Sequence, residues 1–267
     1  MSDALRAELL KLTTTRTWWA IALVLTVYVA LIAVFLTFAD AAARPSTLGR
    51  AAPDLDLPVT VASLYAIGVA VAYVFPALLG VLVITTEYRY RTITPTFLAQ
   101  PLRSRVLLAK LAVATATGAL YGVAALALTV PAVAGVLTAT GHPTRLGNPG
   151  VQATLARSVV AFTLWAAVGV GVGMLVRDQV AAIVVVVATS QIVEPLLRVG
   201  LAAWSVTRGV SRYLPGSAAD ALTGASIYTS AGGAPLLAPW AGALILVGYA
   251  LALAAAGAWL TARRDVA

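Results

Sequence analysis

Six long runs of apolar residues divide this sequence, and four of them contain no charged side chain at all. A bilayer core is about 30 Å thick, so a helix crosses it with about 20 residues. Hydrophobic residues make up 61% of the chain and charged residues 10%, against about 45–50% and about 25% in soluble domains. We therefore predict an all-α polytopic membrane protein with six transmembrane helices, at Trp18–Phe38, Val59–Ile84, Val106–Ala139, Ser158–Val176, from Val180 onward, and Leu236–Leu260.

The same composition argues against a soluble enzyme, a disordered chain and a nucleic-acid-binding domain. The net charge is +8, but its 18 lysines and arginines are spread over short segments between the apolar runs. Such charges set the orientation of membrane helices. The chain has no cysteine and one histidine, so we expect no metal site and no cofactor in it. We expect the first run to be retained, because it is longer than the roughly 7–15 residues of a signal-peptide core.

Lysine and arginine counts favour an orientation with both termini inside. In that arrangement 11 of these residues lie on the cytoplasmic side and 7 on the other, and the 11 occupy shorter segments. Because positive charge accumulates in cytoplasmic loops, we predict an N-in, C-in topology.

Residues 1–17 have the pattern of an amphipathic helix. Leu5, Leu9 and Leu12 share one helical face, and Lys11 lies opposite. We predict an interfacial helix that turns into the membrane at Trp18. The alternative is a charged leader that only sets orientation.

The loop at 85–105 combines basic, aromatic and apolar residues. Thr94-Pro95 resembles a helix start, and Pro101 would end that helix. We predict a short cytoplasmic helix that presents a docking face; the alternative is a solvated basic loop. Glu87 is expected to pair with Arg89, Arg91 or another nearby arginine in an exposed ion pair, which contributes only about 0–1 kcal/mol.

Residues 195–235 are predicted to form one or two short helices that dip into the outer leaflet, with a capping signal at Ser217-x-x-Asp220. Just before them, Glu194 and Arg198 stand four residues apart in the order that favours a helical ion pair. We favour a structural pair at the helix end over a substrate site.

Two small-residue motifs lie within the spans. Gly118-x-x-x-Gly122 and Gly169-x-x-x-Gly173 place glycines one turn apart, where helices can approach closely.

The sequence contains no phosphate-binding G-x-x-x-x-G-K-[ST] motif. Its only lysines, Lys11 and Lys110, are not in glycine-rich loops, and His142 stands alone. We find no catalytic constellation and predict that the chain is not itself an enzyme.

The chain resembles the permease subunit of type-2 ABC transporters, in the bacterial drug- and bacteriocin-resistance branch. The resemblance covers nearly the whole length as one permease domain, 1–267. It rests on the amphipathic leader followed by Trp18-Trp19, and on Leu214-Pro215-Gly216-Ser217-Ala218 before the last span. Its most specific part follows the second span, as Glu87-Tyr88-Arg89-Tyr90-Arg91-Thr92-Ile93 and then Phe97-Leu98-Ala99-Gln100-Pro101.

The resemblance implies a separate cytoplasmic P-loop ATPase, in two copies, that binds ATP and Mg²⁺ and docks on the loop after the second span. It implies docking and coupling roles for Glu87, Tyr88, Arg89, Tyr90, Arg91, Thr92, Ile93 and Phe97. It also implies a second permease chain, a copy of this one in preference to a paralogue, in the bacterial cytoplasmic membrane. The expected activity is export of an amphipathic or apolar compound such as a drug, peptide or lipid. The alternatives are a membrane scaffold or sensor subunit that docks a cytoplasmic partner through its basic loop, and a membrane-embedded transferase.

Overall fold

The computed structural model describes residues 2–43, 53–99, 102–202, 207, 209–226 and 235–264. All regular elements in these ranges are helical, and six helical stretches are long and apolar enough to cross a membrane. The prediction of six such helices is confirmed. The stretches are Thr17–Ala41, Pro58–Arg89, Ser104–Ala139, Pro149–Leu175, Gln179–Leu201 and Pro239–Leu260.

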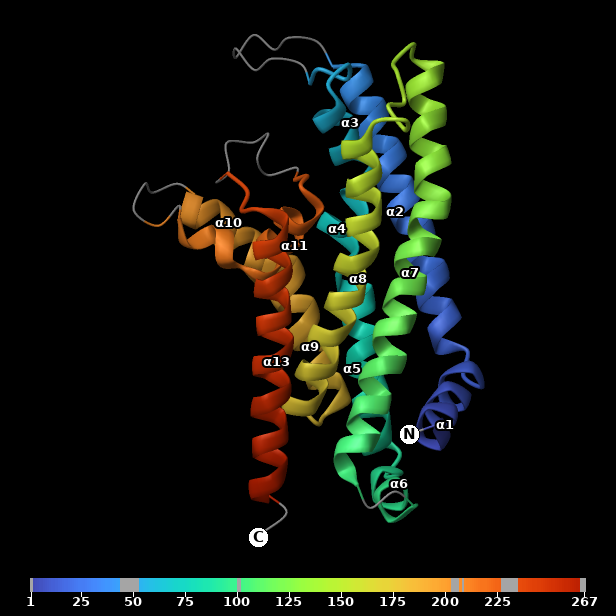
Figure 1. The fold of residues 1–267 in the computed structure, drawn as a ribbon, viewed down its shortest axis with the longest axis vertical. Coiled ribbons are helices and arrows are strands. Elements are labelled where there is room, and N and C mark those ends of the chain that lie inside the picture. Colours follow the sequence, from blue (N-terminus) through green and yellow to red (C-terminus); the bar gives the residue numbers. More distant parts are fainter. Residues whose placement is uncertain are drawn as a thin grey trace.

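The helices form an elongated bundle (Figure 1). Helix α1 (Ser2–Thr13), helix α6 (Ile93–Ala99) and the last turns of helix α13 (Pro239–Arg264) lie at the same end. We call this the terminal end. Helix α2 (Thr17–Ala41) begins there and packs mainly along helix α7 (Arg103–Ala139).

The second span consists of three consecutive helices rather than one. Helices α3 (Pro58–Tyr65), α4 (Ile67–Ala72) and α5 (Val74–Arg89) are separated by single residues, the second of which is Tyr73. Pro76 has no N–H to give to residue 72, and its ring crowds the carbonyl group there. The break at Tyr73 follows from this proline.

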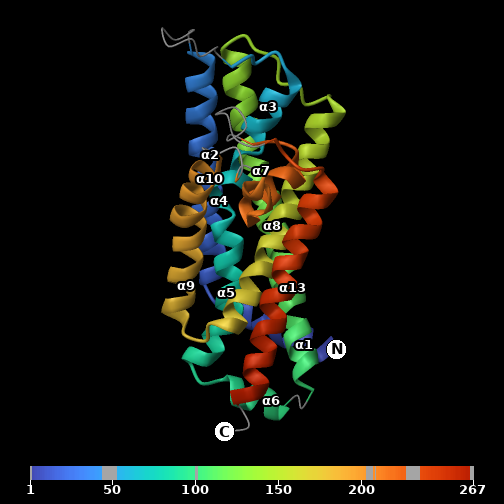
Figure 2. The same ribbon diagram turned by 90° about the vertical axis from the view of Figure 1, so that its left-hand side faces the viewer.

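Helix α8 (Pro149–Leu175) lies at the centre of the bundle and packs against α5, α7 and α13 (Figures 1 and 2). It begins nine residues before the predicted start at Ser158. The Asn148 side chain accepts a hydrogen bond from the Gly150 N–H at 2.8 Å, and Pro149 occupies the first helical position. The cap and the proline stabilise a helix start at Pro149, so the helix forms there although its first turns contain polar residues.

The fifth span changes its helical form. Helix α9 (Gln179–Ala188) continues into a π-helical turn at Thr189–Val193 and then into α10 (Glu194–Ala202). Pro195 cannot donate to the preceding turn, and a π-turn is a common way to accommodate such a defect.

Short helices precede the last span. A 3₁₀ turn at Val210–Tyr213 leads into α11 (Pro215–Thr223), which packs on α13. The predicted capping signal is wrong, because Ser217 and Asp220 lie inside α11 rather than at its start. Pro215, with its fixed φ, begins the helix instead.

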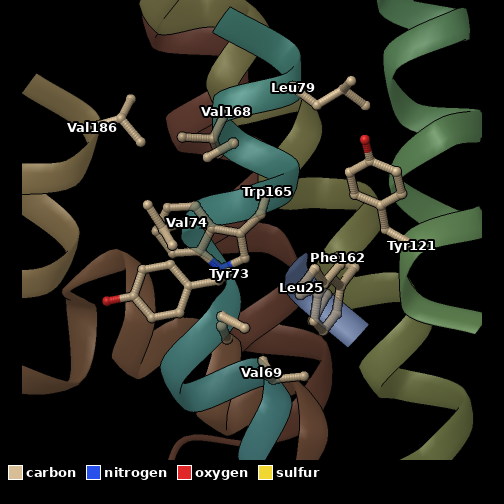
Figure 3. Packing of buried hydrophobic residues seen from close by; sticks show 14 of the residues in the cluster. Leu25, Val69, Tyr73, Val74, Leu79, Tyr121, Phe162, Trp165, Val168 and Val186 are labelled. Carbon is tan, nitrogen blue, oxygen red and sulfur yellow. The ribbon is translucent and has the colours of Figure 1, made fainter. Parts of the chain in front are cut away.

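Aromatic and branched side chains fill the core between α5, α7 and α8 (Figure 3). The rings of Tyr73 and Trp165 stack with centroids 4.2 Å apart, and the Tyr121 hydroxyl donates to the Trp18 carbonyl oxygen at 2.6 Å. The core therefore connects the broken second span to α8 and ties α7 to the start of α2.

Candidate functional site

A tight turn at the terminal end reverses the chain between α5 and α6. The Thr92 N–H donates to the Glu87 carbonyl and the Arg91 N–H to the Tyr88 carbonyl, at 2.9 and 3.2 Å. Arg91 has a φ of 56°, so this arginine holds the left-handed position that glycine usually takes in a Schellman motif. The turn fixes the direction in which α6 leaves the bundle.

The segment after α5 presents apolar and basic side chains to its surroundings. Tyr90 is 68% exposed and Leu98 79% exposed, and Leu102 at the start of α7 is also exposed. Arg91 and Arg105 are exposed beside them. We call these five residues the docking face. Tyrosine and arginine are among the residue types that are enriched at protein interfaces.

The other residues of the predicted docking loop have separate surroundings. Tyr88 is half-buried, with the Arg177 guanidinium 5.4 Å from its ring centroid. Arg89 reaches the Gln179 side-chain oxygen at 3.5 Å. These contacts join the C-terminal end of α5 to the turn between α8 and α9. Thr92 is exposed, Ile93 is half-buried, and the Phe97 side chain lies outside the described residues.

Four charged side chains form a ring where α1, α5 and α7 meet; we call Glu8, Lys11, Glu87 and Lys110 the charge ring. The Lys110 ammonium lies 2.8 Å from Glu8 Oε2 and 2.8 Å from Glu87 Oε1. Lys11 bonds to Glu8 at 2.7 Å and also to Glu87 Oε1. Each lysine thus bridges both glutamates, and the four charges cancel.

The ring corrects the expected ion-pair partners of Glu87. It is 5% exposed and pairs with the two lysines, not with Arg89 or Arg91 in solvent. The small stabilisation expected for an exposed pair is therefore wrong here. A carboxylate at this depth needs partners, because removing one partner of a buried pair costs about 3–5 kcal/mol.

Helix α1 packs on the bundle through Ala4 and Glu8, and two leucines of the predicted apolar face, Leu5 and Leu12, are half-buried beside them. Ala4 and Glu8 are buried, whereas Leu9 and Leu10 are exposed. Lys11, expected on the outer face, reaches into the ring. Partial burial disfavours its ammonium, but hydrogen bonds to Glu8 and Glu87 outweigh this and raise the pKa of Lys11 above its ordinary value.

Sequence reasoning missed three members of the ring, Glu8, Lys11 and Lys110. The available signal was Lys110, a lysine inside an apolar run, which requires an acidic partner. The chain has only three glutamates, so few candidates existed. The separations in sequence, up to 102 residues, hid the pairing.

A second ion cluster lies in the opposite half of the bundle; we call Glu194, Arg198 and Asp220 the distal ion cluster. Arg198 lies 2.9 Å from Glu194 and 2.8 Å from Asp220, and all three residues are buried. Glu194 Oε1 also accepts hydrogen bonds from the N–H groups of Gly216 and Ser217 at 2.6 and 3.2 Å. Glu194 therefore caps α11 from another helix, which the sequence pattern of α11 alone did not reveal.

Two carboxylates share one guanidinium in the distal ion cluster. Complete burial raises the pKa of Asp220 above its ordinary value, although Arg198 and the Ser226 hydroxyl, 2.6 Å away, favour its charged form. The predicted Glu194–Arg198 pair is thus part of a cluster that joins α10 to α11. The Tyr73 hydroxyl, at the break between α4 and α5, lies 3.5 Å from Glu194 Oε2 and donates to the Ser190 carbonyl oxygen at 2.7 Å.

The two glycine motifs lie at helix contacts. Gly118 and Gly122 of α7 face α8, where an added Cβ would lie 2.7 Å from Ala166 Cβ and 3.0 Å from Val159 Cα. Gly169 and Gly173 of α8 face α5. These glycines allow α8 to approach both neighbours closely.

No protein-family model matches the chain, and no curated protein matches its sequence closely enough to indicate a family. Among the described residues, no group of three or more histidine, cysteine or acidic side chains is arranged to hold a metal ion.

Proposed function

We propose that this chain is the membrane-spanning subunit of an ATP-driven ABC transporter that exports an amphipathic or apolar compound. It works with two copies of a cytoplasmic P-loop ATPase, which bind ATP and Mg²⁺, and with a second copy of itself. The observation that carries the proposal is the docking face beside the charge ring, at the end of the bundle that holds both α1 and the last turns of α13.

The docking face suits a protein partner. Exposed Leu98 and Tyr90 offer apolar contact, and Arg91 and Arg105 offer charge. Helix α6 connects two of the long spans, so a force applied to it acts directly on α5 and α7.

The charge ring supports transmission of that force. It contains four ion pairs, of which one lies within α1 and three join α1 and the inner ends of α5 and α7 to one another; two of those three involve the buried Lys110. We propose that the three helices move together when the ATPases close, because separating them would leave charges buried without partners.

The packing of the core favours a pathway between two copies. Buried aromatic and branched side chains occupy the centre of the bundle between α5, α7 and α8 (Figure 3). Exposed apolar side chains along α2 and α9, among them Leu31 and Val184, are available to lipid or to a second copy.

The test is purification of the complex. The chain is co-expressed with the P-loop ATPase encoded nearest to it, and the mass of the purified complex is measured. We expect two copies of each subunit. Leu98→Asp should release the ATPase, whereas Leu57→Asp, an exposed leucine at the opposite end, should retain it. A folded chain that retains no ATPase would favour the scaffold or sensor alternative.

A further inference from the structure

A cavity of about 220 Å³ lies beside the charge ring, between α1, the start of α2, α5 and α7. Its polar lining includes Lys11, Thr15, Trp18, Glu87 and Tyr90. Drug-sized ligands occupy pockets of about 300–1,000 Å³, so this cavity suits a smaller group.

Two buried polar atoms of the cavity-lining residues have no hydrogen-bond partner. They are Trp18 Nε1, which is a donor, and Glu87 Oε2, which is an acceptor. Buried polar atoms are nearly always satisfied, so an unpaired donor and an unpaired acceptor beside one cavity indicate a missing partner. That partner must accept a hydrogen bond at one point and donate one at another.

Further donors gather on the Trp18 side. The first N–H groups of a helix have no intrahelical partners, and no side chain caps the N-terminus of α2. The Lys11 side chain is 44% exposed and lines the same cavity. These donors favour an anionic group at this position.

The charge balance selects the kind of ligand. The four charges of the ring already cancel, so an added anion or cation alone would leave a net charge beside buried groups, which is costly. A zwitterion adds no net charge. Its anionic part suits the Trp18 side, and its cationic donor suits Glu87.

The remaining lining indicates a lipid. Leu12, Leu79, Leu82 and Val113 form an apolar side of the cavity. The cavity lies at the ends of the membrane-spanning helices, where tryptophan marks the level of the head groups. An acyl-bearing molecule can place its head group among the polar residues and its glycerol and chains against the leucines.

We propose that this cavity binds the phosphoethanolamine head group of a membrane phospholipid. The phosphate faces Lys11, the Trp18 indole N–H and the first turn of α2, and the ammonium donates to Glu87 Oε2. Both unpaired atoms are buried, so binding includes a small shift of the side chains that cover them. The inference does not depend on the proposed transport activity.

The experiment measures the thermal stability of the purified full chain in detergent micelles with added lipid. Phosphatidylethanolamine should raise the unfolding temperature. Phosphatidylcholine, which has the same charges but no N–H donor, and phosphatidylglycerol, which has no ammonium group, should do so only at roughly tenfold higher concentration, as expected for loss of one hydrogen bond to a charged group. Soluble glycerophosphoethanolamine carries the same head group without acyl chains. A lipid site should bind it more weakly than the intact lipid, which distinguishes a lipid ligand from a soluble one.

Two matched variants locate the site. Trp18→Phe removes the indole donor and should weaken the phosphatidylethanolamine effect about tenfold. Trp19→Phe alters an exposed neighbour that does not line the cavity and should leave the effect unchanged. Equal stabilisation by the three lipids would overturn the proposal and would indicate non-specific solvation of the apolar helices. Equal responses of the two variants would also overturn it, because the lipid effect would then not arise at this cavity. If Trp18→Phe fails to fold, the comparison of the three lipids on the unmodified chain still tests the proposal.

Discussion

Lys110 and Glu8, which are 102 residues apart in the sequence, form an ion pair at 2.8 Å with both side chains buried. The pair attaches the amphipathic helix α1 to the start of α7. Glu87 accepts from the same ammonium group, so the C-terminal end of α5 is held at the same point. One buried lysine thus organises three helices at the end of the bundle that we propose receives the ATPase.

The two lysines of the ring should differ in their contribution to stability. Lys110→Met removes the buried cation and leaves the two buried carboxylates with only the half-exposed Lys11 as a partner, so it should lower the free energy of unfolding by about 3–5 kcal/mol. Lys11→Met affects a half-exposed side chain and should lower it by about 0–1 kcal/mol. Unfolding in mixed detergent and dodecyl sulfate micelles measures both. Adding Glu8→Gln to Lys110→Met should recover part of the loss. Equal losses for the two single variants would contradict the ring as described.

Lysine chemistry offers a second test, because the chain contains only these two lysines. An amine-reactive reagent should modify Lys11 but not Lys110 in the folded protein, since Lys110 is 1% exposed. The raised pKa of Lys11 keeps its amine protonated up to higher pH than an ordinary lysine, so its reaction should be slow at about pH 8.5. Glu87→Gln removes one hydrogen bond that raises this pKa and should speed the reaction. Mass spectrometry of peptides gives the sites; modification of Lys110 in the folded chain would refute the buried position.

Close helix packing predicts a contrast between two glycines. At Gly169 an added Cβ would overlap the Ala77 carbonyl oxygen, so Gly169→Ala must push α8 away from α5. Overpacking of this kind costs about 1–3 kcal/mol. A Cβ added at Gly135 in α7 would meet no heavy atom within 4 Å, so Gly135→Ala should be neutral or stabilise by up to about 1 kcal/mol. The same micelle unfolding assay compares them, and a neutral Gly169→Ala would show that the two helices are not in close contact.

The orientation in the membrane follows from the charge asymmetry and can be read with introduced cysteines, since the chain has none. Thr92, before α6, and Thr140, at the other end of α7, are both exposed. In intact cells an impermeant thiol reagent should label Thr140→Cys, and it should label Thr92→Cys only after the membrane is permeabilised. The reverse labelling would place the docking face on the wrong side for an ATPase.

The lengths of the apolar runs were enough to predict six long helices. A helix needs about 20 residues to cross the bilayer, whatever its tertiary contacts are. The run lengths did not predict the start of α8 at Pro149, where the Asn148 cap was present but the apolar run had not begun. They also missed the breaks at Tyr73 and Thr189–Val193, whose cause in each case is a nearby proline.

The site was less predictable than the fold. The exposed residues of the docking face lie in one continuous segment, so their composition alone indicated a surface loop. The charge ring and the distal ion cluster join residues from separate helices, and pairing across such distances has no local signal. Lys110 and Asp220 show this, since each is buried and depends on partners from other helices.

The most direct test of the central claim is photo-crosslinking from the docking face to the ATPase. A photoreactive phenylalanine analogue is placed at Leu98, and at Leu57 as the control, in the chain co-expressed with the ATPase encoded nearest to it. Irradiation of membranes should give a crosslinked species containing the ATPase from Leu98 and none from Leu57. A Leu98 sample in which the chain is folded and inserted, yet crosslinks to no ATPase, would contradict the proposal that this chain is an ABC transporter permease.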